Sequence, residues 1–140
     1  MLPHKLLPKL WVAVRRAHED IKLSHGHNAK HAWNVAKTAI ELAGDDQDLA
    51  RSTCAAALCH NADHIARRIG TPPERLPGAI REMVEIWLMQ TDLFGPGKDI
   101  VIDAVVNHSS PNKNSDDLVL VVLKDADRLE SLKPTVTIIC

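Results

Sequence analysis

The sequence lacks the features that would place the protein in a membrane or on nucleic acid. None of its 140 residues belongs to a run approaching the roughly 20 apolar residues that span a bilayer. The formal net charge is -1, so no general excess of basic side chains is present to attract a polyanion. We therefore expect neither a membrane nor a nucleic acid as a partner.

Cysteine is scarce, and its three positions do not have the spacing of a metal finger. Cys54 and Cys59 fall in the same predicted helix, whereas Cys140 stands apart. This odd set predicts reduced thiols and a cytoplasmic protein. Prolines and lysines interrupt the apolar opening segment, which also has no small-residue cleavage site, so we expect no signal peptide.

Internal repeats, low-complexity tracts and linkers are also missing from the chain. Hydrophobic residues make up 45% of the sequence and charged residues 25%, which is the balance of an ordered globular protein. A chain of this length can bury a real core. We therefore predict one domain over residues 1–140, with its core over about residues 25–132.

Apolar residues recur at helical spacing through most of the chain. The predicted helices cover residues 10–23, 27–42, 49–69, 80–89 and 99–106. Gly44 and Gly70 are natural stops, and Asp45, Asp46 and Asp48 are candidate N-caps for the third helix. Residues 94–97 are predicted to form a loop.

Residues 118–123 form an unbroken apolar run with three valines, which favours a strand by local propensity. No second strong strand exists to pair with it, and residues 124–130 have a helical pattern. We therefore predict a buried helix over this segment. The fold class that follows is an all-α, single-domain helical bundle with about five to seven helices. Residues 135–140 are ambiguous.

A dense group of polar side chains follows the apolar run of residues 55–58. His60, Asn61, Asp63 and His64 lie within five residues, and a continuous helix would carry both histidines on one face. Polar groups on an apolar helix are costly unless something binds them, and a metal ion is the commonest partner of clustered histidines and carboxylates. The alternative is a helix that ends in a solvated polar turn.

Two further groups of metal-capable residues lie on other predicted helices. His27 and His31 belong to the second helix, and Asp127 belongs to the last. Packing three such helices together could bring one ligand from each to a shared point. Two imidazoles and a carboxylate would hold a divalent ion and leave positions open for water and substrate, which predicts hydrolytic chemistry.

These residues, in this order, resemble the HD-domain superfamily of metal-dependent phosphohydrolases. His31 matches the first histidine of that family, His60-Asn61 matches its His-Asp pair, and Asp127 matches its last aspartate. The run from His27 to His31 also looks like the first-histidine motif of cyclic nucleotide phosphodiesterases, which share the fold. The resemblance implies a bundle of the HD-domain type over roughly residues 25–132.

The resemblance implies metal ligation by His31, His60, Asn61 and Asp127. The divalent ion would be Mn, Fe, Co, Ni, Zn or Mg, and it would activate water against a nucleotide or another small phosphorylated metabolite. In several families of this fold, an acidic residue at the position of His64 serves in proton transfer. A histidine could take that part, and Asp63 is a second candidate.

Asn61 departs from the family pattern, in which this position is an aspartate. Its amide oxygen could ligate the metal, or it could hydrogen-bond to a neighbouring group. The neutral side chain predicts weaker metal affinity, a different preferred ion or lost catalysis. The chain would then be a catalytically weakened domain that binds a metal or ligand or serves regulation. A third interpretation is a helical interaction domain with incidental histidines and no metal.

Two other histidines are candidates for the reaction. His27 could act as an acid for the leaving group or as a second-metal ligand, and a surface role is the alternative. His108 follows a predicted helix and could contact substrate phosphate, or it could be a helix-terminal histidine favoured by the dipole. Apolar residues on exposed helix faces would permit a homodimer.

Overall fold

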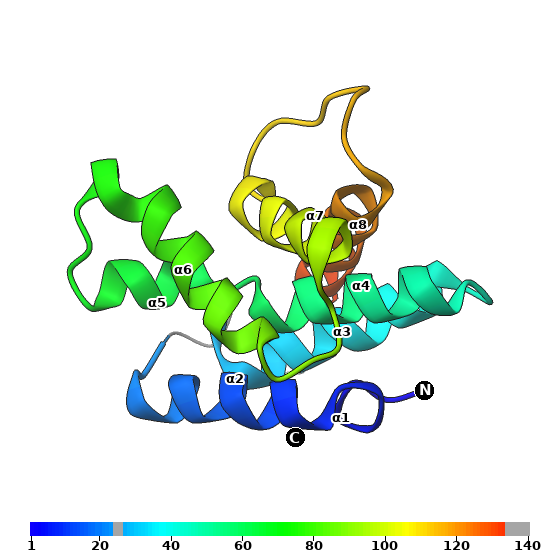
Figure 1. The fold of residues 1–140 in the computed structure, drawn as a ribbon, viewed down its shortest axis with the longest axis horizontal. Helices are drawn as coiled ribbons and strands as arrows, with labels where there is room; N and C mark the ends of the chain where they lie inside the picture. The colour runs from blue at the N-terminus through cyan, green and yellow to red at the C-terminus, as the bar shows by residue number, and fades with distance from the viewer. Residues whose placement is uncertain (24–26, 134–140) are drawn as a thin grey trace, which may run out of the picture.

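The computed structural model describes residues 1–23 and 27–133 of the protein, and these residues form helices with no strand among them (Figure 1). The all-α prediction is confirmed. The helices are α1 (Pro3–Leu6), α2 (Pro8–Asp20), α3 (Ala29–Ala43), α4 (Gln47–Cys59), α5 (Ala62–Arg68), η2 (Pro73–Arg75, a 3-10 helix), α6 (Leu76–Leu88), α7 (Gly95–Asn107) and α8 (Leu118–Leu132). Cys140 and the ambiguous residues 135–140 lie outside the described residues.

Local capping signals set several helix ends as the sequence predicts. Gly44 follows α3 with a φ of 64°, which a residue with a side chain rarely adopts. Asp46 is the N-cap of α4, where its side chain accepts a hydrogen bond from the Leu49 N–H. Asn28 caps α3 in the same way, by accepting from the N–H of His31.

Most predicted helices begin or end a few residues away from their predicted bounds, and two predicted elements differ in kind. The helix predicted over residues 49–69 is divided into α4 and α5 at His60 and Asn61. Both the ring Nδ1 and the backbone N–H of His60 donate to the Ala57 carbonyl, at 2.6 and 3.3 Å, which tightens the last turn of α4. The predicted loop at residues 94–97 instead opens α7, because Pro96 is tolerated in a first turn whose N–H groups have no helical partner.

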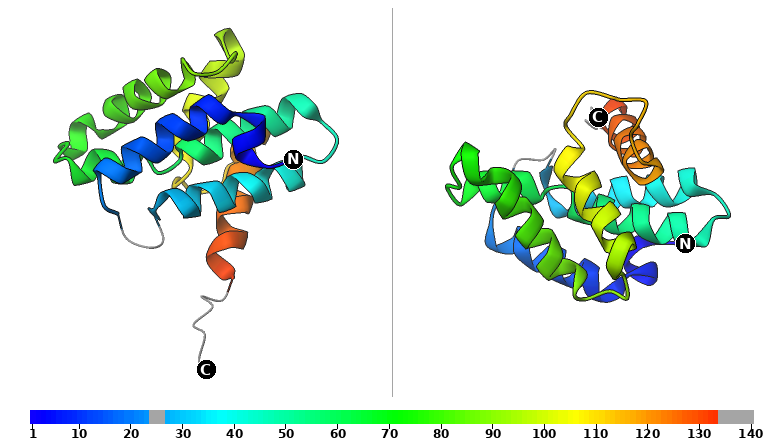
Figure 2. Two further views of the ribbon diagram at one scale, coloured as in Figure 1. Left: turned by 90° about the horizontal axis from the view of Figure 1, so that it is seen from below. Right: turned by 45° about the horizontal axis from the view of Figure 1, so that its top comes forward.

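The valine-rich segment forms α8, as predicted. Asp117 is its N-cap and accepts from the N–H of Val119. Val119, Val122 and Leu123 are buried in the common core, so packing outweighs the strand propensity of the valines. This helix packs against α3 and crosses it (Figure 2), which brings Asp127 toward His31.

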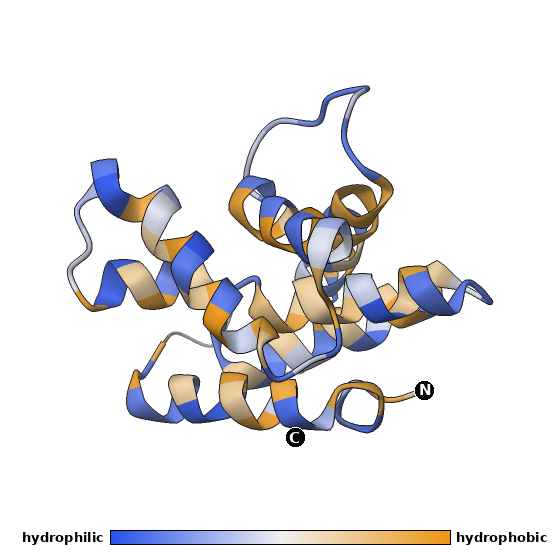
Figure 3. Ribbon diagram, viewed as in Figure 1, coloured by the Kyte–Doolittle hydropathy of each residue, from blue (hydrophilic) through white to orange (hydrophobic). Residues whose placement is uncertain are grey.

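Helix α4 lies at the centre of the fold and packs against α2, α3, α7 and α8. Residues 53–63 are all buried, and the small side chains of Ala55, Ala56 and Ala57 let neighbouring helices approach closely. In contrast, the connection between α7 and α8 is largely hydrophilic (Figure 3). Within the described residues, no helix is both long and apolar enough to cross a membrane.

Candidate metal centre

Three of the predicted ligands come together at one point of the bundle. Asp127 Oδ1 on α8 lies 3.0 Å from His31 Nε2 on α3 and 3.7 Å from His60 Nε2 at the end of α4. All three ligand atoms lie within 4.8 Å of one another. Residues separated by up to 96 positions in the chain therefore form one cluster of metal-capable atoms.

His60 is held with its Nε2 lone pair free. A carbonyl can only accept, so the Nδ1 that faces the Ala57 carbonyl carries the proton and Nε2 is unprotonated. Burial lowers the pKa of His60 to about 4, and the nearby His108 adds to this against the opposing effect of Asp127. At neutral pH this ring therefore presents a lone pair to the Asp127 carboxylate without a proton between them.

Asp127 is ionised at the same pH. Burial by itself would raise its pKa, but the hydrogen bond from His31 and the proximity of His60 and His31 outweigh burial and lower it. The site thus contains a carboxylate and a neutral imidazole whose acceptor atoms are 3.7 Å apart. A cation between these two acceptors would satisfy both of them.

Asn61 is completely buried, and its amide nitrogen is surrounded by acceptors. The two hydrogens of Nδ2 are shared among three acceptors, the His27 carbonyl at 2.8 Å, the Asn28 carbonyl at 3.1 Å and His18 Nε2 at 3.0 Å. His18 Nδ1 donates to the Val14 carbonyl at 2.8 Å, so His18 Nε2 must accept. Of the two interpretations of Asn61, hydrogen bonding to neighbouring groups is observed.

The other end of the Asn61 amide is left open. Oδ1 is buried and has no hydrogen-bond partner. Buried carbonyl oxygens are normally satisfied, and Asn61 directly follows His60 in the chain, so its oxygen is a candidate for a further ligand. With two imidazole nitrogens, a carboxylate and an amide oxygen, the donor set fits a divalent transition metal such as Mn, Fe, Co, Ni or Zn.

His64 and His27 lie beside the cluster as a pair. Their rings stack with centroids 3.6 Å apart and planes at 22°, and His27 in turn lies 6.5 Å from His31 between ring centroids. Because α4 ends before Asn61, His64 belongs to α5 and not to the helix that ends at His60. The predicted single face carrying both histidines is therefore absent from this structure.

Asp63 lies beneath His64 and is anchored by Arg67. Arg67 Nη1 donates to Asp63 Oδ2 at 2.9 Å, whereas Asp63 Oδ1 has no hydrogen-bond partner and lies 3.8 Å from His64 Nε2. Burial lowers the pKa of His64, and Asp63 acts in the opposite direction. The Asp63 side chain is 7% exposed and that of His64 is 27% exposed, so only the histidine can meet a ligand directly.

His108 reaches the cluster from the opposite end. It caps α7, its Nδ1 donates to the Val105 carbonyl at 2.6 Å, and its ring lies 5.5 Å from that of His60. The five imidazoles His64, His27, His31, His60 and His108 therefore follow one another, with consecutive ring centroids 3.6, 6.5, 5.3 and 5.5 Å apart. Every histidine that the sequence nominates belongs to this row.

His18 is the functional candidate that the sequence analysis missed. It lies on α2, is 8% exposed, and contacts Asn61 directly. The signal was present in the spacing, because His18 follows Leu10 and Val14 at intervals of four residues and so continues the buried stripe of its helix. A histidine in an apolar stripe needs a partner, and here that partner is Asn61.

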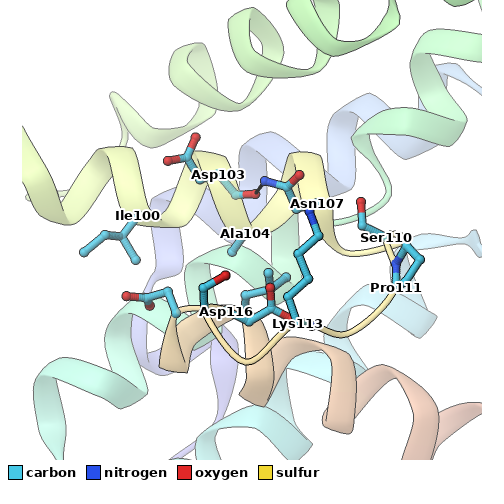
Figure 4. Close-up of a pocket in the computed structure, with 11 residues that line it drawn as sticks. Ile100, Asp103, Ala104, Asn107, Ser110, Pro111, Lys113 and Asp116 are labelled. Carbon is cyan, nitrogen blue, oxygen red and sulfur yellow. Dashed lines mark hydrogen bonds between the residues drawn. The ribbon is translucent and has the colours of Figure 1, made fainter.

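A separate pocket of about 360 Å³ lies between α7 and the connection that precedes α8 (Figure 4). Asp103, Asp116 and Lys113 line it, and Asn107 donates to the Asp103 carbonyl at its edge. It contains none of the predicted site residues. The predicted site residues are therefore grouped at the histidine row, apart from this pocket.

Comparison with protein-family models, curated proteins and solved structures finds no match for this chain. The likeness to the HD-domain superfamily consequently stays a resemblance carried by His31, the His60-Asn61 pair and Asp127. What these residues can do must be derived from the distances and hydrogen bonds given above.

Proposed function

We propose that the protein is a metal-dependent phosphohydrolase acting on a nucleotide or another small phosphate ester. The observation that carries the proposal is the convergence of His31 Nε2, His60 Nε2 and Asp127 Oδ1 within 4.8 Å. The resemblance of the same three positions to the HD-domain motif supports the choice of reaction. When bound, a divalent ion supplies Lewis acidity toward both a phosphate ester and water at neutral pH.

Four side chains are the proposed ligands of the ion. His31, His60 and Asp127 hold the ion, with Asn61 Oδ1 as the additional oxygen. These donors come from α3, α8 and both sides of the break between α4 and α5, so closure of the site depends on the packing of the bundle. The site is thereby built on helices, which hold ligands more rigidly than loops.

His64 transfers a proton to or from the substrate, and Asp63 orients it. The free Asp63 Oδ1 lies 3.8 Å from His64 Nε2 and favours a proton on that nitrogen, while Arg67 fixes the carboxylate from its other oxygen. His108 Nδ1 donates to the Val105 carbonyl, so its Nε2 would donate to phosphate in the imidazolium form, in which both ring nitrogens carry a proton. His27 packs against His64 and limits its orientation.

A second candidate function is favoured by the neutrality of Asn61. With only the Asp127 carboxylate among the four proposed ligands, the site neutralises less of the charge of a divalent ion than two carboxylates would. A weakly loaded site would make the protein a metal- or ligand-binding regulatory module without turnover. Metal content and turnover distinguish the two functions.

The first experiment is metal analysis of purified protein by elemental mass spectrometry, followed by a phosphate-release screen with Mn, Co, Ni and Mg. We expect about one ion per chain, bound through neutral imidazoles and a carboxylate. We also expect release of phosphate from at least one nucleotide or sugar phosphate. His60→Ala should lose both. His4→Ala is the matched control, because His4 accepts from Trp33 Nε1 and lies outside the cluster. Metal without turnover favours the regulatory module, whereas no metal after reconstitution overturns the phosphohydrolase and leaves only the ligand-binding form of the module.

We also propose a cytoplasmic location, supported by the buried and unpaired thiols of Cys54 and Cys59. Burial raises the pKa of Cys54 to about 12, so this thiol is protonated at neutral pH and is a poor nucleophile. Nothing in the described residues bears on the possible homodimer, which stays a prediction.

A further inference from the structure

A shallow basic pocket of about 330 Å³ opens beside the proton-transfer residues. Its walls come from the segment after α2, the residue that precedes the N-cap of α3, and one side of α5. The end of α2 lies under α5 in the ribbon view (Figure 1). The residues that line the pocket are Lys22, Leu23, His27, His64, Arg67 and Arg68.

The pocket is lined by cationic and imidazole groups and by no acidic side chain. Arg67 is engaged by the buried carboxylate of Asp63. Within residues 1–23 and 27–133, Lys22 and Arg68 take part in no ion pair and both are exposed. Two positive charges therefore border this space without local compensation, and an anion placed there would be attracted by both.

The stacked imidazoles supply the polar floor of the pocket. Each ring of the His27–His64 pair has at least one N–H donor, and the rings are 3.6 Å apart between centroids. Charged groups that hydrogen-bond to donors of this kind make stronger contacts than neutral ones. The chemistry of the lining therefore suits a phosphate group, which offers several acceptor oxygens together with negative charge.

The pocket shares a wall with the metal centre. His27 lies 6.5 Å from His31 between ring centroids, and the His27 carbonyl accepts from Asn61. His27 therefore belongs both to the pocket and to the row that contains the cluster, so a ligand that filled both would place one anionic group at the cluster and another against Lys22 and Arg68. A monophosphate would leave those two side chains without a ligand.

We infer that this basic pocket is a second-phosphate site, so that the preferred substrates carry two linked phosphates, as nucleoside diphosphates do. The inference rests on the proposed phosphohydrolase for the identity of the reaction. Phosphate binding by the pocket itself does not require the metal, because none of its lining residues is among the proposed ligands.

The test is titration of inorganic pyrophosphate into metal-free protein by isothermal calorimetry. We compare the native chain with the double variant Lys22→Glu/Arg68→Glu. The control is Arg16→Glu/Lys37→Glu, which reverses two exposed charges on α2 and α3 away from the pocket. We expect the pocket variant to bind at least about tenfold more weakly, since two charged contacts are lost. The control should bind like the native chain, and circular dichroism should show all three folded.

A second arm measures kcat/KM for a nucleoside diphosphate and the matching monophosphate with the metal present. Preference for the diphosphate that falls in the pocket variant supports the inference. Pyrophosphate binding that depends on Lys22 and Arg68, without hydrolysis of any substrate, supports the pocket and overturns the phosphohydrolase. Hydrolysis of monophosphates, with pyrophosphate binding equal in all three proteins or absent from all, overturns the pocket and leaves the phosphohydrolase in place.

Discussion

Asn61 is fixed by its neighbours as an amide. Two carbonyls, which can only accept, and His18 Nε2, which accepts while that ring is neutral, surround Nδ2. A carboxylate in this position would face the two carbonyls without a donor between them, and it would gain a donor from His18 only if that buried ring took up a proton. The surroundings of this residue therefore suit an amide side chain better than a carboxylate.

We accordingly expect Asn61→Asp to destabilise the protein and weaken metal binding. An unpaired buried carboxylate costs several kcal/mol, so the free energy of unfolding of metal-free protein at pH 7 should fall by about 3 kcal/mol or more. Urea titration and a metal-affinity titration measure the two effects. Asn112→Asp, in the exposed connection before α8, is the control and should change neither. Tighter metal binding at unchanged stability would show that the site lacks a carboxylate.

At the scale of single elements, helix ends are decided by backbone conformation. Gly44 closes α3 at φ 64° and ψ -131°, and a Cβ added there would meet nothing within 4 Å. Gly78 lies inside α6 at an ordinary φ, and a Cβ there would also meet open space. A substitution by alanine at either glycine therefore tests the preference of the backbone conformation without adding a steric clash.

Gly44→Ala should lower the free energy of unfolding by about 1–3 kcal/mol, because an L residue is strained in this region of φ and ψ. Gly78→Ala should raise it by up to about 1 kcal/mol, because alanine loses less conformational freedom in a helix. Urea unfolding of both variants beside the native chain checks the opposite signs. Equal effects at the two positions would contradict the conformational argument.

The break between α4 and α5 is the element-scale feature on which the site depends. It turns His60 toward Asp127 while His64 moves to a separate helix and stacks on His27. Residues 49–69 read as one helix by their periodicity, since nothing in the local pattern requires an interruption. The long-range contacts of Asn61 with His18 and with residues 27 and 28 accompany the break.

At the scale of the whole molecule, stability should depend on pH through the buried histidines. The folded pKa of His60 is about 4, below the usual 6.5, mainly because of burial. The pKa values of His18 and His64 are lowered as well, again mainly by burial. Between pH 6.5 and 4 the unfolded chain therefore binds more protons than the folded chain, so protonation favours unfolding.

Metal-free protein should consequently lose stability as the pH falls from about 6.5 to about 4. The loss from His60 alone is on the order of 3 kcal/mol. Urea titrations at half-unit pH intervals measure the free energy of unfolding across this range. The His60→Gln variant should lose most of the part of the pH dependence that His60 contributes. A free energy of unfolding that is constant across this window would show that His60 is not buried in its neutral form.

The residue types and their order determined much of this protein by themselves. The apolar periodicity gives the helices, Gly44 and Asp46 mark two of their ends, and the absence of a second strand settles α8 as a helix. The sequence also nominates His31, His60 and Asp127, because clustered ligand types at helical positions are uncommon without a reason. These inferences depend on interactions between residues close together in the chain, which a sequence displays directly.

Only the tertiary structure determined which buried polar side chains contact one another. It paired Asn61 with His18 across 43 positions and brought five imidazoles from separate segments into one row. It also gathered Lys22 and Arg68 into the basic pocket. A buried amide or imidazole takes whichever partner the packed helices bring within hydrogen-bonding distance, and that partner depends on the three-dimensional packing rather than on local sequence.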